Sequence, residues 1–166
     1  MSQALYPPAR PLSVGESLDL AFLVFKATVV KCLPYGAFAE NFTMSLLDET
    51  SVCLGDVYAL GAARVQVSQP RQPCSNITRR WKLRGLTEKV EATGRTGWYM
   101  RVLEEAEVVA GEPVVLLDRP SPEWSVARAT RAMQQRARDA AEVRALLAVA
   151  ALSDAWRQTL SGVAAR

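Results

Sequence analysis

Short apolar stretches separated by glycines, between residues 51 and 117, limit the fold more than any other feature of this sequence. Tyr58 and Leu60 alternate with other side chains, and so do the large residues along Trp98–Leu103. A period of two places alternate side chains on one face of a strand, and glycine permits the turn to the next strand. Further alternating positions are Val52 with Leu54 and Val65 with Val67, and a final strand is expected at Pro113–Leu117. The pattern predicts a mainly β domain, built as a barrel or a sandwich.

The composition changes after Pro120-Ser121-Pro122 to alanine, arginine, leucine and glutamine, which all favour helices. Three amphipathic helices fit this tail, and Ser153 is expected to cap the third. Their apolar faces contain Val126, Ala129 and Met133; Val143, Leu146, Leu147 and Ala150; and Trp156, Leu160 and Val163. We therefore predict a small three-helix domain at residues 120–166.

Two further elements are expected before this tail. A β-branched run at Phe22–Val30 predicts one strand in the proline-rich residues 1–35. A short helix is expected over Glu88–Ala92, capped by Thr87 and ended by Gly94. These elements divide the chain into an N-terminal segment at 1–35, a β domain at 36–119 and the helical domain.

Composition excludes several kinds of site. The 166 residues include three cysteines and no histidine, and no CxxC spacing occurs. Zinc fingers, plant-type iron–sulfur sites and histidine-based triads are therefore excluded. An odd number of cysteines in a chain without a clear secretory leader fits a reduced, cytoplasmic setting. The longest apolar run, Leu20–Leu33, is too short and too charged to span a membrane, so no membrane partner is expected.

The net charge of +3 is unevenly distributed. Residues 1–119 contain 13 cations and 13 anions, and residues 120–166 contain 7 cations and 4 anions. Strong nucleic-acid binding calls for a denser basic stripe than this, so we expect no nucleic-acid partner.

The segment Ser68–Cys74 is the strongest candidate for chemistry. Two prolines stiffen it directly after a strand, and it presents Arg71 and the thiol of Cys74. Five cations and no acid lie between Arg71 and Arg84, which favours a thiolate and attracts anions. Composition alone leaves open that Cys74 is simply a small buried residue; for Cys53 and Cys32 a structural role is favoured.

A second cluster, Gly36–Thr43, places polar groups after a glycine turn and is weak alone. In their order and their residues, the two clusters and three further segments resemble the MOSC family, specifically its hydroxylaminopurine-resistance branch with a three-helix tail. The matching segments are Gly36–Thr43, Val52–Asp56, Val67–Cys74, Gly94–Glu104 and Arg119–Trp124. Residues 1–35 carry no such match and lack the His-Gly-Gly segment of the family.

The resemblance implies a MOSC-type β-barrel, complete or incomplete, that binds the molybdenum cofactor (molybdopterin). Cys74 matches the ligand of the metal and would be the catalytic residue. Asn41, Thr43, Arg71 and Arg95 would bind the cofactor. A soft thiolate suits molybdenum, and the cations suit a pterin phosphate.

The implied activity is the reduction of a small N-hydroxylated substrate, with a separate electron-donor protein. Two alternatives remain open at this point. The chain could be a non-catalytic cofactor or sulfur carrier that retains the MOSC core, or an interaction protein that uses its basic helical tail.

Overall fold

The computed structural model describes residues 10–11, 20–22 and 36–164. Five strands form one antiparallel sheet in the order β2-β5-β4-β3-β7. They span Leu20–Phe22 (β2), Val57–Leu60 (β3), Ala63–Pro70 (β4), Trp98–Glu104 (β5) and Val114–Asp118 (β7). A second pair joins β1 (Arg10–Pro11) to β6 (Glu107–Val108). Within the described residues the sheet is open rather than closed into a barrel.

The central strand β4 explains where the core lies. Val65 and Val67 are fully buried, as the alternating pattern predicted, and Trp98 and Met100 of β5 are buried beside them. The register between β4 and β5 shifts between Val67 and Gln69, which is a β-bulge or irregularity. Beyond this shift Ser68 and Gln69 are both buried, and the strand continues to Pro70. The end of β4 is thus held inside the protein immediately before Cys74.

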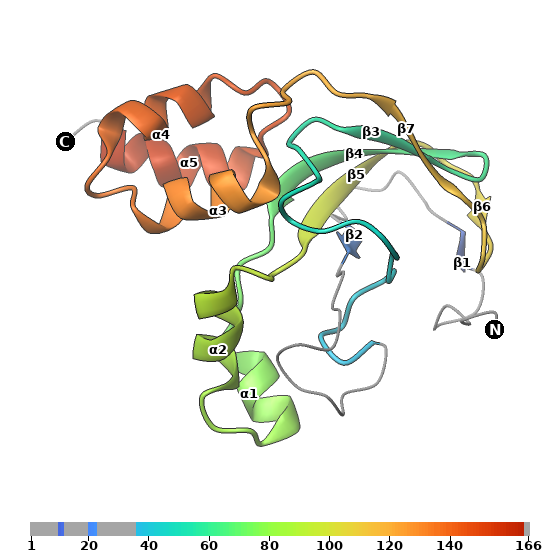
Figure 1. Ribbon diagram of the computed structural model, residues 1–166, viewed down its shortest axis with the longest axis horizontal. Helices are drawn as coiled ribbons and strands as arrows, with labels where there is room; N and C mark the ends of the chain where they lie inside the picture. The colour runs from blue at the N-terminus through green and yellow to red at the C-terminus, as the bar shows by residue number, and fades with distance from the viewer. Residues whose placement is uncertain (1–9, 12–19, 23–35, 165–166) are drawn as a thin grey trace.

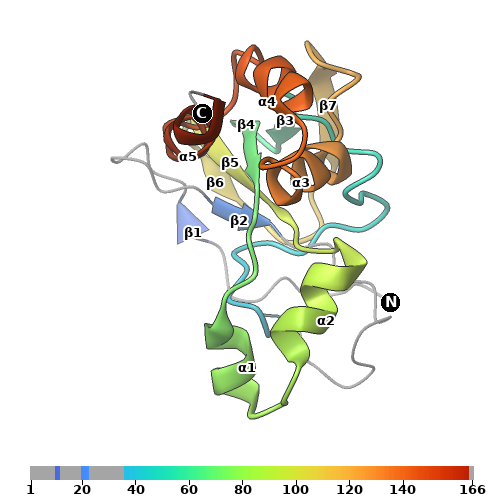
Figure 2. The same cartoon turned by 90° about the vertical axis from the view of Figure 1, so that its left-hand side faces the viewer.

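Two short helices follow β4, and Figures 1 and 2 place them together at the end of β4 and β5, apart from the C-terminal helices. They are α1 (Ser75–Trp81) and α2 (Leu86–Thr93). The prediction of α2 is confirmed, and Gly94 ends it in a left-handed conformation (φ +65°). The predicted N-cap is wrong, because Gly85 occupies that position while the Thr87 hydroxyl pairs with Thr78.

The three predicted C-terminal helices are confirmed. They are α3 (Val126–Gln134), α4 (Ala140–Leu147) and α5 (Asp154–Ala164), grouped beside the sheet in Figure 1. The Ser125 and Asp139 side chains cap α3 and α4, and the Ser153 oxygen accepts from Trp156 N at 3.3 Å, as expected of a cap on α5. No described helix is long and apolar enough to cross a membrane.

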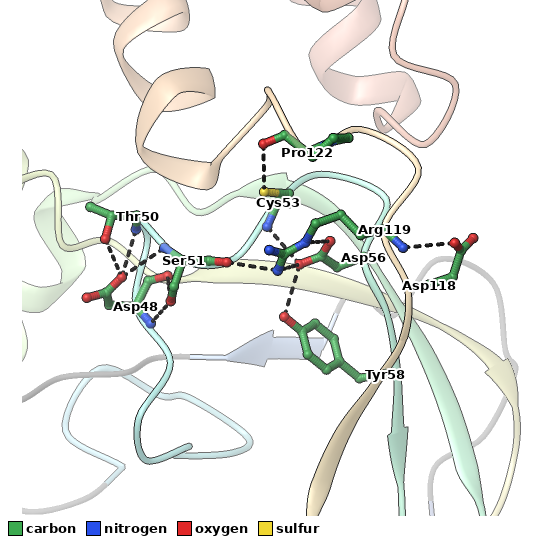
Figure 3. A network of polar contacts seen from close by, with 9 residues as sticks. All are labelled: Asp48, Thr50, Ser51, Cys53, Asp56, Tyr58, Asp118, Arg119 and Pro122. Atoms are coloured by element: carbon green, nitrogen blue, oxygen red, sulfur yellow. Dashed lines mark hydrogen bonds and ion pairs between the residues drawn. The ribbon is translucent and has the colours of Figure 1, made fainter.

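An ion pair between buried Asp56 and half-buried Arg119 joins the sheet to the linker before α3 (Figure 3). Asp56 is fully buried and accepts two hydrogen bonds from Arg119, at 2.8 Å and 2.7 Å. Its carboxylate also accepts from Cys53 N at 2.9 Å and from the Tyr58 hydroxyl at 3.0 Å. The Cys53 thiol donates to the Pro122 carbonyl, so the structural role predicted for this cysteine is confirmed.

The predicted fold class, a β domain followed by three helices, is confirmed. The strand expected at Val52 and Leu54 is wrong, because this segment makes only an isolated bridge from Cys53 to Ser125. Of the strand expected at Phe22–Val30, the first residue lies in β2; residues 23–35, with Cys32, lie outside the described residues. The domain boundaries at 35 and 119 remain predictions, although β2 pairs with β5 in the main sheet.

Candidate functional site

A shallow pocket lies where the Cys74 loop, α1, α2 and the start of β5 meet. Its volume is about 260 Å³, including the space open to solvent. The residues that line it are Phe38, Arg71, Pro73, Cys74, Ile77, Val90, Arg95 and Thr96. The pocket therefore combines a thiol and two cations with an apolar wall, and it contains three of the residues predicted as site residues.

Cys74 occupies the position before the first residue of α1, with an extended backbone (φ −129°, ψ 161°). Its thiol is free and exposed, so the alternative that Cys74 is a small buried residue is wrong. The carbonyl oxygen of Cys74 accepts from Ile77 N at 3.3 Å and from the Thr87 hydroxyl at 3.2 Å. Contacts from both helices thus hold the backbone while the thiol stays accessible.

Arg71 is fixed from two sides. Its backbone N donates to Gly97 O at 2.9 Å, and its Nη2 donates to Phe38 O at 2.5 Å. Its Nη1 atom is buried and has no hydrogen-bond partner among the described residues. A buried, unpaired guanidinium nitrogen is costly, so a ligand acceptor at this point would be bound favourably.

Glu40 organises the loop that contacts Arg71, a role that the sequence did not reveal. Its nearly buried carboxylate accepts from Gly36 N at 2.6 Å and from Phe38 N at 2.9 Å. The loop then offers the Phe38 carbonyl to Arg71 and the Ala37 carbonyl to Trp81 Nε1, at 2.7 Å. The Gly-x-Phe-x-Glu motif is therefore a folded turn that positions the arginine.

Glu49 holds the segment that follows Arg95 and Thr96, and the sequence did not reveal this role either. Its carboxylate is 4% exposed and accepts from Gly97 N at 2.8 Å. Gly97 follows Arg95 and Thr96 of the pocket and bonds to Arg71 through its carbonyl. Burial raises the pKa of Glu49, and the neighbouring Arg95 partly opposes this increase. A glutamate between predicted strands carries no sequence signal of such a contact.

This buried carboxyl predicts a pH dependence of stability. The pKa of Glu49 is higher in the folded protein than in the unfolded chain, where it is about 4.3. Its contribution to the free energy of unfolding is therefore fully present below the pKa of the unfolded chain. This contribution is lost as the pH rises through the pKa of the folded protein. We expect Glu49→Gln to gain stability relative to the wild type at pH 7 and to lose this gain at pH 4. Urea unfolding at both pH values measures it.

The control for this prediction is Glu91→Gln, which removes an exposed carboxylate from α2. We expect its stability to follow the wild type at both pH values. A Glu49→Gln variant with the same stability difference from the wild type at pH 4 and pH 7 would contradict the prediction.

The remaining predicted site residues are placed differently from one another. Arg95 lines the pocket beside Thr96. Asn41 and Thr43 are half-buried and do not line it, so their contact with a cofactor remains a prediction. Trp98 packs in the core with no exposed area. Among the described residues no group of three or more histidine, cysteine or acidic side chains could hold a metal ion.

Two family models match the chain. The MOSC domain matches residues 5–115, a match that includes most of the segment lacking the motifs described above. The YiiM-like 3-alpha helix domain matches residues 124–161, which contain α3, α4 and most of α5. The two matches together cover most of the sequence.

The relatives agree with these matches. The chain is 43% identical over 125 residues to the uncharacterized protein YflK of Bacillus subtilis, covering 75% of this chain and 57% of that protein. It is 32% identical to protein YiiM of Escherichia coli, covering 75% and 55%. A protein named reductase from Gibberella moniliformis is 38% identical, covering 61% and 18%. The chain thus spans little more than half the length of YflK and YiiM, and less than a fifth of the fungal protein.

Solved structures give the same result. The crystal structure of YiiM from Geobacillus stearothermophilus superposes with a TM-score of 0.85 and 34% identity, covering 93% of this chain and 85% of that one. YiiM from Escherichia coli also has a TM-score of 0.85, with 26% identity and 95% and 85% coverage. The arrangement of sheet and helices is therefore shared with these proteins.

Proposed function

The chain belongs to the MOSC family, and on this premise we propose that it binds a molybdenum cofactor through the thiolate of Cys74 and reduces N-hydroxylated compounds. The observation that carries the proposal is the pocket itself. It brings an accessible thiol together with Arg71, whose buried Nη1 lacks a partner among the described residues. A thiolate donor and an unsatisfied cation are what a phosphate-bearing molybdenum cofactor requires of its site.

The described residues fit this group. Cys74 would hold the metal, and Arg71 with Arg95 would bind anionic parts of the cofactor. When bound, the cofactor supplies a redox centre for the conversion of R–NHOH, two electrons and two protons into R–NH₂ and water. The pocket is shallow, and its volume includes space open to solvent, so most of the cofactor would lie outside it.

The protein's own side chains would prepare the site before any ligand arrives. The Glu40 carboxylate fixes the turn whose Phe38 carbonyl orients Arg71. Phe38, Ile77 and Val90 are buried on the apolar side and would exclude water from the ligand. An arginine held by one nitrogen keeps the other in place for an acceptor at little entropic cost.

The reductive activity is supported by one relative. The protein from Gibberella moniliformis that aligns over 102 residues is named a reductase. Only 18% of that protein is covered, so its name supports reduction in general and leaves the substrate class to experiment.

Metal analysis and turnover together test the proposal. The full chain, produced in a host that makes the molybdenum cofactor, is expected to contain molybdenum and pterin in near-stoichiometric amounts. With reduced benzyl viologen as donor it should convert 6-N-hydroxylaminopurine to adenine. Protein without molybdenum under these conditions would contradict the proposed cofactor, and loaded protein without turnover would contradict the proposed activity.

Arg71→Lys tests the second part of the site. Lysine keeps the charge but cannot bond the Phe38 carbonyl and offer a second, separate donor in the same fixed plane. We expect about tenfold weaker cofactor retention during dialysis, because one charge-assisted hydrogen bond is worth about 1.5–3 kcal/mol. Arg79→Lys, on the exposed face of α1, is the matched control and should retain the cofactor fully.

One observation favours the non-catalytic carrier as a second candidate. The Cys74 thiol is exposed and lines a shallow pocket, so a bound cofactor or sulfur atom could be transferred from it to another protein. A carrier would bind molybdenum without reducing the purine substrate, and it would release the cofactor to an apo-enzyme.

A further inference from the structure

The positive charge of the chain is concentrated around the two helices that follow β4. Residues 71–95 contain seven cations and two anions, a net charge of +5, whereas the whole chain carries +3. The rest of the molecule is therefore net negative by two charges. A local charge of this size creates a field that attracts acidic surfaces.

Five of these cations form a basic surface on α1, α2 and the turn between them. They are Arg79, Arg80, Lys82, Arg84 and Lys89, and all are exposed. In the described part of the chain none of them forms an ion pair. Cations in the last turn of a helix interact favourably with its dipole, which accounts for Arg79 and Arg80. It does not account for Lys82 or Arg84, which follow the helix.

The centre of this surface is apolar. Leu83 is 40% exposed between Lys82 and Arg84. Trp81 is half-buried and lies under the Arg80 guanidinium, 5.6 Å from its ring centroid. An apolar centre surrounded by charge is the usual arrangement of protein interfaces.

The basic surface is also close to the pocket. Cys74 lies at one end of α1 and Lys82 at the other, and seven residues of helix span about 10 Å. Figures 1 and 2 show α1 and α2 projecting from the end of the sheet, where the three C-terminal helices do not cover them. A protein docked on this surface would lie within about one helix length of the thiol.

We propose that this basic surface docks an acidic electron-donor protein and so delivers electrons to the Cys74 site. This inference rests on the proposed function, since the reduction consumes two electrons for each N–O bond that is broken. A two-electron reduced flavin, or two one-electron carriers in succession, would supply them. Electron-transfer partners bury small interfaces and depend on electrostatic attraction for fast encounter.

A nucleic acid is the less favoured ligand of the same charge. The five cations are gathered on a short helical hairpin, and the molecule outside residues 71–95 is net negative. Binding along a phosphate backbone calls for a stripe that continues over the surface. A compact acidic patch on a small protein fits the hairpin better.

The test uses the triple variant Arg79→Gln, Lys82→Gln and Arg84→Gln. Arg80 is kept because its guanidinium lies over Trp81. With reduced flavodoxin as the acidic donor, we expect the KM for flavodoxin to rise about tenfold at low salt, from three exposed charge pairs. The kcat and KM with benzyl viologen should stay unchanged. The KM of the wild type for flavodoxin should rise with ionic strength, and that of the variant should rise less, because the variant keeps Arg80 and Lys89.

The matched control is Arg131→Gln, Arg138→Gln and Arg144→Gln, which removes three exposed cations from the helical domain. Its kinetics with flavodoxin should equal those of the wild type. Two results would overturn the docking surface. One is an equal rise of the KM for flavodoxin in both triple variants, and the other is an impaired reaction of the α1 variant with benzyl viologen as the donor.

A binding measurement separates this inference from the proposed function. Oxidised flavodoxin, followed by its flavin fluorescence, should bind the wild type more tightly than the α1 variant whether or not turnover occurs. Absence of turnover with benzyl viologen would contradict the proposed reductase activity and would leave the docking surface unaffected. No binding of flavodoxin, or tighter binding of a single-stranded DNA 20-mer that the same variant abolishes, would overturn the docking surface alone.

Discussion

Replacing Cys74 by serine is expected to weaken molybdenum binding by at least about 100-fold and so to lower the molybdenum content of the purified protein. Loss of groups that only support a metal ligand costs 10–100-fold in affinity, and loss of the ligand itself should cost at least as much. A serine hydroxyl is a hard donor that stays protonated at neutral pH, whereas a thiolate is soft and anionic. Inductively coupled plasma mass spectrometry of the purified variant measures the metal, and turnover should fall in parallel.

The fold should not change in this variant, because the Cys74 side chain is exposed and makes no capping hydrogen bond. The matched control is Cys53→Ala, which removes a buried thiol that does not line the pocket. The control should retain molybdenum. A serine variant with full metal content would show that Cys74 is not the ligand.

Replacing Asp56 by alanine is expected to lower the free energy of unfolding by at least about 2 kcal/mol, because two buried donors lose their acceptor at about 1–3 kcal/mol each. The variant would leave the Arg119 guanidinium without its two carboxylate acceptors. Cys53 N and the Tyr58 hydroxyl would also lose their acceptor. The pKa of Tyr58 is raised by burial and by the Asp56 charge, so this hydroxyl stays protonated and needs an acceptor.

Thermal unfolding measures this loss as a decrease in Tm of at least about 4 °C for a chain of this length. Asp118→Asn is the control, because Asp118 precedes Arg119 but is exposed. Its carboxylate accepts a hydrogen bond from the backbone N of Arg119 and not from the guanidinium. We expect the control to change stability by less than about 0.5 kcal/mol. Similar losses in both variants would mean that the hydrogen bonds to the buried Asp56 carboxylate are not what stabilises this region.

Contacts between the helical domain and the sheet also support the site indirectly. The Ser153 hydroxyl bonds the side chain of Gln69, and Ser153 N donates to Ser68 O at 3.2 Å. Arg101 Nη2 donates to Ala151 O at 2.7 Å. These contacts hold the helical domain against the end of β4, only a few residues before Cys74. The helical domain therefore supports the strand from which the site loop begins.

The sequence missed α1 for a local reason. Ser75 and Asn76 follow a proline and a cysteine, and no apolar repeat is visible over seven residues. Only Ile77 is buried in this helix, where it packs with Leu86 and Val90 of α2 and with Phe38. The helix is stable because these distant segments pack on it, and a short helix gains most of its stability from such packing.

The sequence by itself determined the strands and helices that have a regular apolar spacing, and the family that a single motif indicates. Alternation of period two predicted β3, β4 and β5, and helical periodicity with capping residues predicted α3, α4 and α5. The motif around Cys74 indicated the family. Each of these signals is local, since burial of one face of a strand or helix requires a fixed spacing along the chain.

Only the tertiary structure decided how the pocket is built. Glu40 and Glu49 are acidic residues without periodicity, yet they accept backbone hydrogen bonds on opposite sides of Arg71. Asp56 and Arg119 are 63 positions apart and form one ion pair, in which the aspartate is fully buried. Burial makes these polar contacts strong and specific, and burial is a property of the packed fold that no stretch of sequence contains.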